Sequence, residues 1–132
     1  MAVTPGELAV WADTALQGGG ECNERAAISR HYYAVYHRAL EWERATLPHL
    51  GNPVAPGPGG MHQELINRLK SPDGRIKAEI AKRSKFAGAR LAILKARRTL
   101  ADYKLGEPLV PGEAANQQAV TRAQLADFDL PG

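Results

Sequence analysis

The ten residues ISRHYYAVYH, Ile28–His37, gather most of the polar aromatic chemistry of this 132-residue chain. They hold three of its four tyrosines and two of its four histidines, together with Arg30. A histidine exchanges a proton near neutral pH, whereas an arginine stays protonated and offers a planar fork of N–H donors to a phosphate. Arg30 and His37 therefore carry the groups needed to attack and stabilise a phosphodiester without a metal.

RNA is the substrate that suits this chemistry, because its internal 2′-OH can act as the nucleophile. His37 is the candidate for removing the proton of that hydroxyl, and Arg30 is the candidate for stabilising charge on the phosphoryl oxygens. DNA lacks the hydroxyl and would not react in this way. Spacing alone favours a simpler alternative, in which Arg30 and His37 are two polar residues on a solvated helix face.

Metal-assisted hydrolysis has less support in the sequence. The four histidines form neither an HExxH nor an HxH pattern. They are His31, His37, His49 and His62. Glu41 follows His37 by four residues, so on a helix it is placed to orient the imidazole or to pair with it. The single cysteine, Cys22, allows no intramolecular disulfide and no cysteine-based zinc pattern. We expect neither a metal nor a cofactor.

The segment that carries these residues is expected to be a helix from about Asn23 to Thr46, because it contains no Gly or Pro and Asn23 can cap it. On this helix Arg30 and His37 differ by about 20° around the axis and by about 10.5 Å along it. They lie opposite an apolar stripe that is expected to face the core, so that Tyr32 is interpreted as a core aromatic. The stripe consists of Ile28, Tyr32, Val35, Ala39 and Trp42.

Four further helices are expected around this one. The first begins with Thr4 as a cap and Pro5 at the first helical position, with Glu7 at capping-box spacing. The others cover residues 61–70, about 75–104 and 113–128. A flexible Gly/Pro loop at 51–60 separates the second helix from the third.

No segment alternates as a strand would, so the sequence predicts an all-α, up-down bundle of four to five helices. The whole chain, 1–132, is expected to be one domain with a core of about 4–126. Gly88, inside the long pattern at 75–104, is expected to mark close packing against a neighbouring helix.

The charges are unevenly distributed along the chain. Residues 68–104 contain 12 Lys and Arg against 3 Asp and Glu, whereas the rest of the chain contains 5 against 11, for a net charge of +3. A cationic segment of this kind either attracts nucleic-acid phosphates or forms a solvated helix face, and the sequence leaves both interpretations open.

Three segments resemble motifs of HEPN-domain proteins. Arg30–His37 resembles the R-x-Y-Y-A-x-aromatic-H signature, with six residues between the Arg and the His. Arg98–Tyr103 is similar to the R-x-x-A-D-Y stretch that follows the long later helix of this family. Gly60–Leu69, with His62 near its start, is a third and weaker match. The three segments follow the family's order and together span roughly residues 24–126.

The resemblance implies a HEPN-like helical bundle with metal-independent endoribonuclease activity, often in toxin–antitoxin or anti-phage defence systems. It also implies a homodimer in which the motifs of two chains meet in one composite cleft. Carried over to this sequence, Arg30 and His37 form the catalytic pair. Further residues that could contact the substrate or support the pair are His31, Tyr33, Glu41, Asp102 and Tyr103.

The helical wheel adds an argument for the dimer. Ala26, Ala27 and Ala34 lie on the same face as Arg30 and His37, and we expect a second copy of the chain to cover these small residues. A two-fold contact through this face would bring two arginines and two histidines together.

Two other functions remain open. In the first, the chain is a non-catalytic binding or regulatory subunit whose Arg/His pair holds a nucleotide or a phosphate. In the second, it is a purely structural helical adaptor, which leaves the composition of Ile28–His37 unexplained. Expected partners are RNA, a second copy of the chain, and an antitoxin, a nucleotidyltransferase or a defence-complex protein.

No stretch approaches the roughly 18 apolar residues of a membrane span, and the N-terminus lacks a basic-then-apolar signal pattern. We therefore expect a cytoplasmic protein with no membrane partner.

Overall fold

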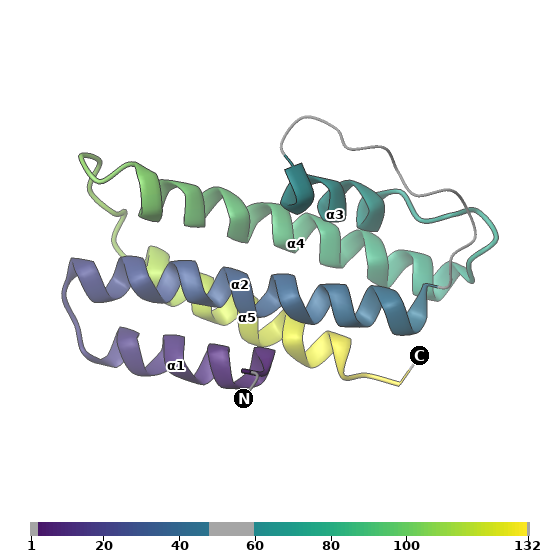
Figure 1. Ribbon diagram of the computed structural model, residues 1–132, viewed down its shortest axis with the longest axis horizontal. Helices are drawn as coiled ribbons and strands as arrows, with labels where there is room; N and C mark the ends of the chain where they lie inside the picture. Colours follow the sequence, from purple (N-terminus) through teal and green to yellow (C-terminus); the bar gives the residue numbers. More distant parts are fainter. Residues whose placement is uncertain (1–2, 48–59, 132) are drawn as a thin grey trace.

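The computed structural model describes residues 3–47 and 60–131, which form five α-helices and no strand (Figure 1). The helices are α1 (Pro5–Gln17), α2 (Glu21–Thr46), α3 (Gly60–Lys70), α4 (Ala78–Tyr103) and α5 (Glu113–Phe128). The predicted all-α class is confirmed. The predicted Gly/Pro loop lies outside the described residues, apart from Gly60, which begins α3.

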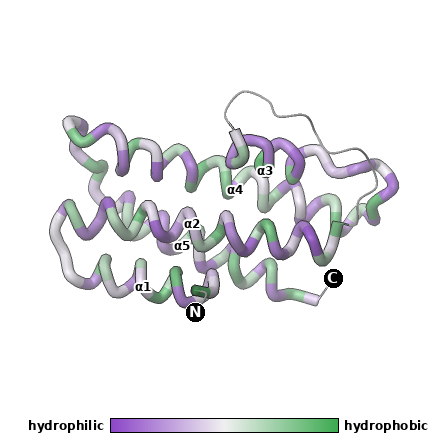
Figure 2. Tube along the Cα trace, viewed as in Figure 1, coloured by the Kyte–Doolittle hydropathy of each residue, from purple (hydrophilic) through white to green (hydrophobic). Residues whose placement is uncertain are grey.

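The helices lie side by side along one long axis (Figure 1). Helix α1 runs antiparallel to α2, and α4 runs antiparallel to α3 and to α5 (Figure 1). Hydrophobic and hydrophilic residues are interspersed along the helices, so that no helix is apolar over its whole length (Figure 2). No helix in residues 3–47 and 60–131 is both long enough and apolar enough to span a bilayer.

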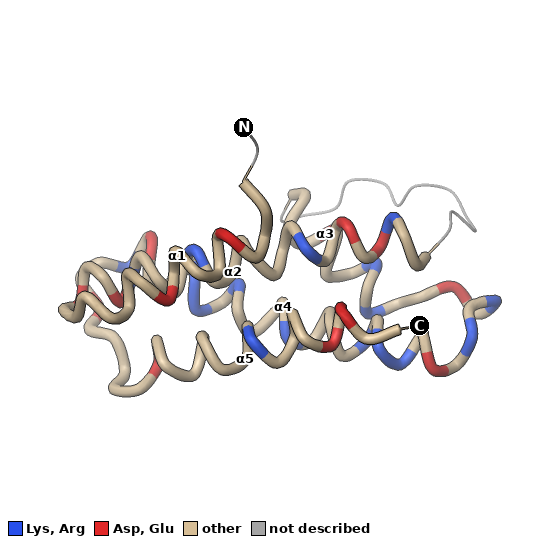
Figure 3. Tube along the Cα trace, turned by 90° about the horizontal axis from the view of Figure 1, so that it is seen from below, with Lys and Arg blue, Asp and Glu red and all other residues tan. Residues whose placement is uncertain are grey.

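The cationic segment 68–104 covers the end of α3, the following turn and α4, with basic residues spread along it (Figure 3). Each of its six arginines has a polar partner within the chain, and four of these partners lie on another helix. The pairs are Arg68–Glu43, Arg75–Asp73, Arg83–Asp127, Arg90–Gln124, Arg97–Gln117 and Arg98–Asp102.

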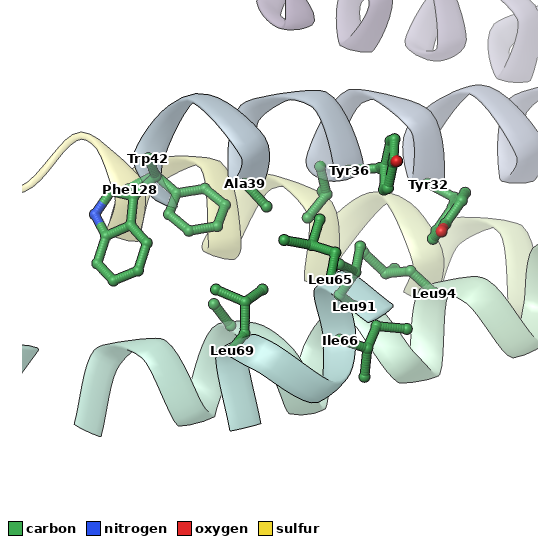
Figure 4. Close-up of a cluster of buried hydrophobic side chains, with 12 residues drawn as sticks. Tyr32, Tyr36, Ala39, Trp42, Leu65, Ile66, Leu69, Leu91, Leu94 and Phe128 are labelled. Carbon is green, nitrogen blue, oxygen red and sulfur yellow. The ribbon is translucent and has the colours of Figure 1, made fainter. Parts of the chain in front are cut away.

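Helix α2 is the central element and packs against each of the other four helices. The five residues of its predicted core stripe are all buried, and the interpretation of Tyr32 as a core aromatic is confirmed. In the core, Tyr32 and Tyr36 of α2 lie near Leu94 of α4, and Trp42 lies beside Phe128 of α5 (Figure 4). Helix α3 completes this cluster with Leu65, Ile66 and Leu69.

The start of α1 follows its predicted cap, whereas the start of α2 does not. The backbone N–H of Glu7 donates to Thr4 Oγ1 at 3.1 Å. Helix α2 begins at Glu21 with Gly20, at φ 86°, as its N-cap. The prediction that Asn23 caps α2 is wrong, because Asn23 lies inside the first turn, where its Nδ2 donates to the carbonyl oxygen of Gly19 at 2.7 Å.

Gly88 allows α4 to approach the end of α3 closely, as predicted. A Cβ atom at position 88 would lie 2.9 Å from Lys70 Cγ and 3.1 Å from Leu69 Cβ. One turn earlier, the buried hydroxyl of Ser84 donates to the carbonyl oxygen of Leu69 at 2.7 Å. Ser84 and Gly88 therefore fix the position of α3 on α4.

Two buried polar side chains join the helices at their backbones. Gln117 of α5 donates to the carbonyl oxygens of Ile28, at 3.2 Å, and of Leu94, at 3.1 Å. Arg25 of α2 reaches the carbonyl oxygens at the C-terminal end of α4. Both contacts satisfy groups that would otherwise be buried without partners.

Candidate functional site

The motif helix α2 carries Arg30, Tyr33 and His37 on one side. Arg30 is half-buried, and its Nη1 lies 3.5 Å from the carbonyl oxygen of Ala26 in the preceding turn. His37 is exposed, and its ring centroid lies 6.3 Å from that of Tyr33, with the planes inclined by 26°. Because α2 is unbroken here, Arg30 and His37 keep the two-turn spacing that the sequence indicates.

Helix α3 adds a second histidine beside His37. His62 Nδ1 lies 2.6 Å from the hydroxyl oxygen of Tyr32. The His62 ring stacks on Tyr36 at a centroid distance of 4.3 Å and meets Tyr33 edge-on at 5.8 Å. The Tyr36 ring also meets His37, at 5.2 Å. Both imidazoles therefore contact the same tyrosine.

Helix α4 adds Arg98, whose guanidinium is surrounded by aromatic rings. Its central carbon lies 5.4 Å from the ring centroid of Tyr32, 5.5 Å from that of Tyr33 and 5.6 Å from that of Tyr103. These are cation–π distances, so the rings stabilise the charge where it is partly removed from water. We call Arg30, Tyr33, His37, His62 and Arg98 the motif face.

Asp102 and Tyr103 lie at the edge of the motif face. The Asp102 carboxylate accepts a hydrogen bond from Ser29 of α2 at 3.1 Å and lies 3.6 Å from Arg98 Nη1. The Tyr103 ring is largely exposed, and its hydroxyl lies 3.4 Å from the same nitrogen. Asp102 thus links α4 to the motif helix, and Tyr103 presents an aromatic surface to solvent.

The electrostatic surroundings of His62 keep it uncharged. Burial is the main cause that lowers the pKa of His62 below its usual value, and the charges of Arg98, Lys95 and His37 act in the same direction. Burial also raises the pKa of the Tyr32 phenol well above its usual value. Tyr32 therefore keeps its proton at neutral pH.

His31 lies away from the motif face, although a helical wheel places it only about 100° from Arg30. It is fully buried, and its Nε2 lies 2.8 Å from Asp13 Oδ1 on α1. The same carboxylate oxygen accepts a hydrogen bond from Gln118 of α5 at 2.8 Å. His31 therefore joins α1, α2 and α5. Of the two roles expected for it, its burial removes contact with substrate and leaves structural support of the motif helix.

The free energy of unfolding is expected to fall as the pH drops below about 6.5, the usual pKa of histidine. Burial lowers the pKa of His31, whose Nδ1 is buried without a hydrogen-bond partner. The unfolded chain then binds the proton first, so stability decreases with falling pH by at most about 1.4 kcal/mol per pH unit for one proton. Urea unfolding between pH 5 and 8 should give a flatter profile for His31→Gln than for the wild type.

His62→Gln is the matched control for this measurement, because the pKa of His62 is lowered too and each variant should remove only its own part of the slope. An unchanged slope in His31→Gln would show that His31 does not cause the acid sensitivity. Asp13 affects the free energy of unfolding at a lower pH than the two histidines do. Burial opposes its ionisation, but hydrogen bonds from Gln118 and His31 hold the pKa of Asp13 below its usual value.

The structure departs from two further expectations about the motif helix. Glu41 is exposed and, among the described residues, forms no hydrogen bond or ion pair with His37. Ala27 and Ala34 are fully buried within the chain. The argument that these two alanines need a second copy to cover them is therefore wrong, because the neighbouring helices already do so. Ala26 stays partly exposed.

His62, Arg98 and Tyr36 are the residues that the sequence did not assign to the site. His62 lies within the segment Gly60–Leu69 and Arg98 begins the segment Arg98–Tyr103, but nothing in their spacing shows that they meet α2. The available signal was the set of three segments, which adds a histidine at 62 and an arginine at 98 to the pair on α2.

The described residues bring no three His, Cys, Asp or Glu side chains together as metal ligands. Two surface hollows lie away from the motif face. One, of about 580 Å³, is lined by Lys82, Arg83 and Phe86 of α4, and the other, of about 550 Å³, by Val10 and Trp11 of α1.

No family model, curated protein or solved structure matches this chain in our comparisons. The resemblance to HEPN-domain proteins thus rests on the three motif segments themselves, and its functional content stays a prediction.

Proposed function

We propose that this protein is a metal-independent endoribonuclease in which Arg30 and His37 act on the RNA backbone. The observation that supports this most is the composition of the motif face. An exposed histidine and an arginine share one side of an unbroken helix, with His62 and Arg98 beside them. A surface of this kind offers proton transfer, positive charge and aromatic faces to a single-stranded nucleic acid.

In the proposed reaction His37 accepts the proton of a ribose 2′-OH, and the 2′-oxygen attacks the adjacent phosphorus. The bond from phosphorus to the 5′-oxygen breaks, and that oxygen takes up a proton. The products are a 2′,3′-cyclic phosphate and a 5′-hydroxyl. Arg30 donates hydrogen bonds to the phosphoryl oxygens, whose negative charge grows in the transition state.

A toxin or anti-phage defence effector in the cytoplasm is the setting that we propose, following the motif resemblance. The proposal includes a homodimer in which two motif faces form one cleft across a two-fold axis. It also includes control by an antitoxin, a nucleotidyltransferase or a defence-complex protein.

The alternative is a non-catalytic binding or regulatory subunit. The observation that favours it is the engagement of Arg98 and His62 by neighbouring tyrosines, because such contacts hold the side chains still for binding. In this case the motif face would bind a nucleotide phosphate without cleaving RNA.

A cleavage assay with the purified wild-type protein tests the proposal. A single-stranded RNA oligonucleotide, the same sequence with 2′-O-methyl groups and the same sequence as DNA are incubated with it in EDTA. We expect only the RNA to be cut, with 2′,3′-cyclic phosphate ends. Intact RNA after incubation with folded protein, whose oligomeric state is measured by sedimentation, would refute the nuclease and leave the binding subunit.

A further inference from the structure

The ring of His62 is held at one of its two nitrogens. Tyr32 is fully buried, and its hydroxyl lies 2.6 Å from His62 Nδ1. The phenol keeps its proton, and His62 Nδ1 is the only hydrogen-bond partner of its hydroxyl among the described residues. Tyr32 therefore donates to Nδ1, so that a neutral His62 carries its hydrogen on the opposite nitrogen, Nε2.

That opposite nitrogen is available for a ligand. No described residue forms a hydrogen bond with His62 Nε2, and this atom is not among the buried polar atoms that lack a partner. The His62 side chain is only half-buried. Its Nε2–H can therefore meet solvent or a ligand at the surface of α3.

The groups around His62 attract an anion but disfavour a proton on the ring. From α4, Arg98 and Lys95 face it, and from α2, His37 does. The remaining neighbours on α2 are the aromatic rings of Tyr33 and Tyr36. His62 is thus an uncharged donor within a positively charged surrounding, which suits it to bind a phosphate oxygen.

We propose that His62 is a phosphate-contacting residue whose Nε2–H donates to a non-bridging oxygen of the RNA backbone, while His37 alone exchanges protons. The inference rests on the proposed function for the identity of its ligand. It separates the two histidines by role. His37 is exposed to solvent, whereas His62 could accept a proton at Nδ1 only by giving up its hydrogen bond with Tyr32.

NMR of protein with ¹⁵N-labelled histidine tests the first half of the proposal without any substrate. The ring nitrogen shifts of His62 should report the Nε2–H tautomer from pH 7 to 8, and Tyr32→Phe should yield a mixture of tautomers. A wild-type ring protonated at Nδ1 or on both nitrogens in this range would overturn the inference.

Two substitutions at position 62 test the second half. Asn carries its amide oxygen near the position of Nδ1, so it can accept from Tyr32 but offers no donor at Nε2. Gln places its amide nitrogen near Nε2 and gives up the contact with Tyr32. Binding to the single-stranded 2′-O-methyl RNA, which cannot be cleaved, is measured by fluorescence anisotropy for both variants. Urea unfolding shows whether each variant folds.

We expect His62→Gln to bind within about threefold of the wild type and His62→Asn to bind about tenfold more weakly, the loss typical of one hydrogen bond to a charged acceptor. The reverse order would show that His62 only accepts the proton of Tyr32. Failure of the wild type to bind this RNA would also overturn the inference. Normal binding without cleavage of unmodified RNA would refute the nuclease and leave this role for His62 intact.

Discussion

Replacing His37 by alanine is expected to lower the rate of RNA cleavage by about 10²–10⁴-fold, the usual contribution of a general base. The free energy of unfolding should hardly change, because the ring is exposed and its aromatic neighbours among the described residues are Tyr33, on which it stacks, and Tyr36, which it meets edge-on. Single-turnover cleavage in EDTA gives the rate, and urea unfolding of the same preparation gives the stability.

Arg30→Ala should lower the rate by about 10²–10³-fold, since it removes a donor that acts on charge formed in the transition state. Lys85→Ala is its matched control, because Lys85 is an exposed cation on α4 outside the motif face. It should cleave RNA at close to the wild-type rate. Cleavage by His37→Ala at the wild-type rate would exclude His37 from the mechanism.

Arg25→Met is expected to reduce the free energy of unfolding by about 2–4 kcal/mol, from lost charged hydrogen bonds and a lost helix-end interaction. Arg25 Nη1 donates to the carbonyl oxygens of Leu100, at 3.2 Å, and Ala101, at 3.0 Å, and Nη2 donates to that of Glu107. The first two belong to the last turn of α4, where the carbonyl of Leu100 also accepts the backbone N–H of Lys104 at 3.1 Å and that of Ala101 has no further helical N–H to accept.

Arg44→Met is the control for this loss, because Arg44 is an exposed arginine on the same helix. Its cost should stay below about 0.5 kcal/mol, as for most surface substitutions. Urea unfolding at neutral pH compares the two variants, and Arg25→Lys should fall between them, because an ammonium cannot reach several carbonyls at once. Equal losses for Arg25→Met and Arg44→Met would mean that the contact with α4 adds nothing to stability.

Much of this fold could be predicted from local signals. Pro5 and Thr4 define the start of α1, and the predicted range 113–128 coincides with α5. Gly88 could be recognised as a packing residue, because a glycine inside a long helical pattern needs a reason to be there. These features depend on a few neighbouring residues, which the sequence displays directly.

The parts that the sequence did not predict depend on which helices meet. A helical wheel places His31 at the border of the motif face, but only the position of α1 brings Asp13 to it and buries it. Ala34 appears exposed on the same wheel, yet it is buried, because the central helix α2 has neighbours on more than one side. The contact between His62 and Tyr32 likewise depends on the placement of α3.

The position of α3 has a consequence for how the motif face holds together over time. Helix α2 is enclosed by the other four helices, whereas α3 packs on α4 and more lightly on α2. Amide exchange reports the opening of individual elements, and opening of α3 from α2 would expose Leu65, Ile66 and Leu69 while the other four helices keep their own contacts. His62 would leave with it, whereas Arg30 and His37 would stay on α2. The histidine pair therefore exists only while α3 is closed, and a ligand bound to both histidines would slow amide exchange in α3.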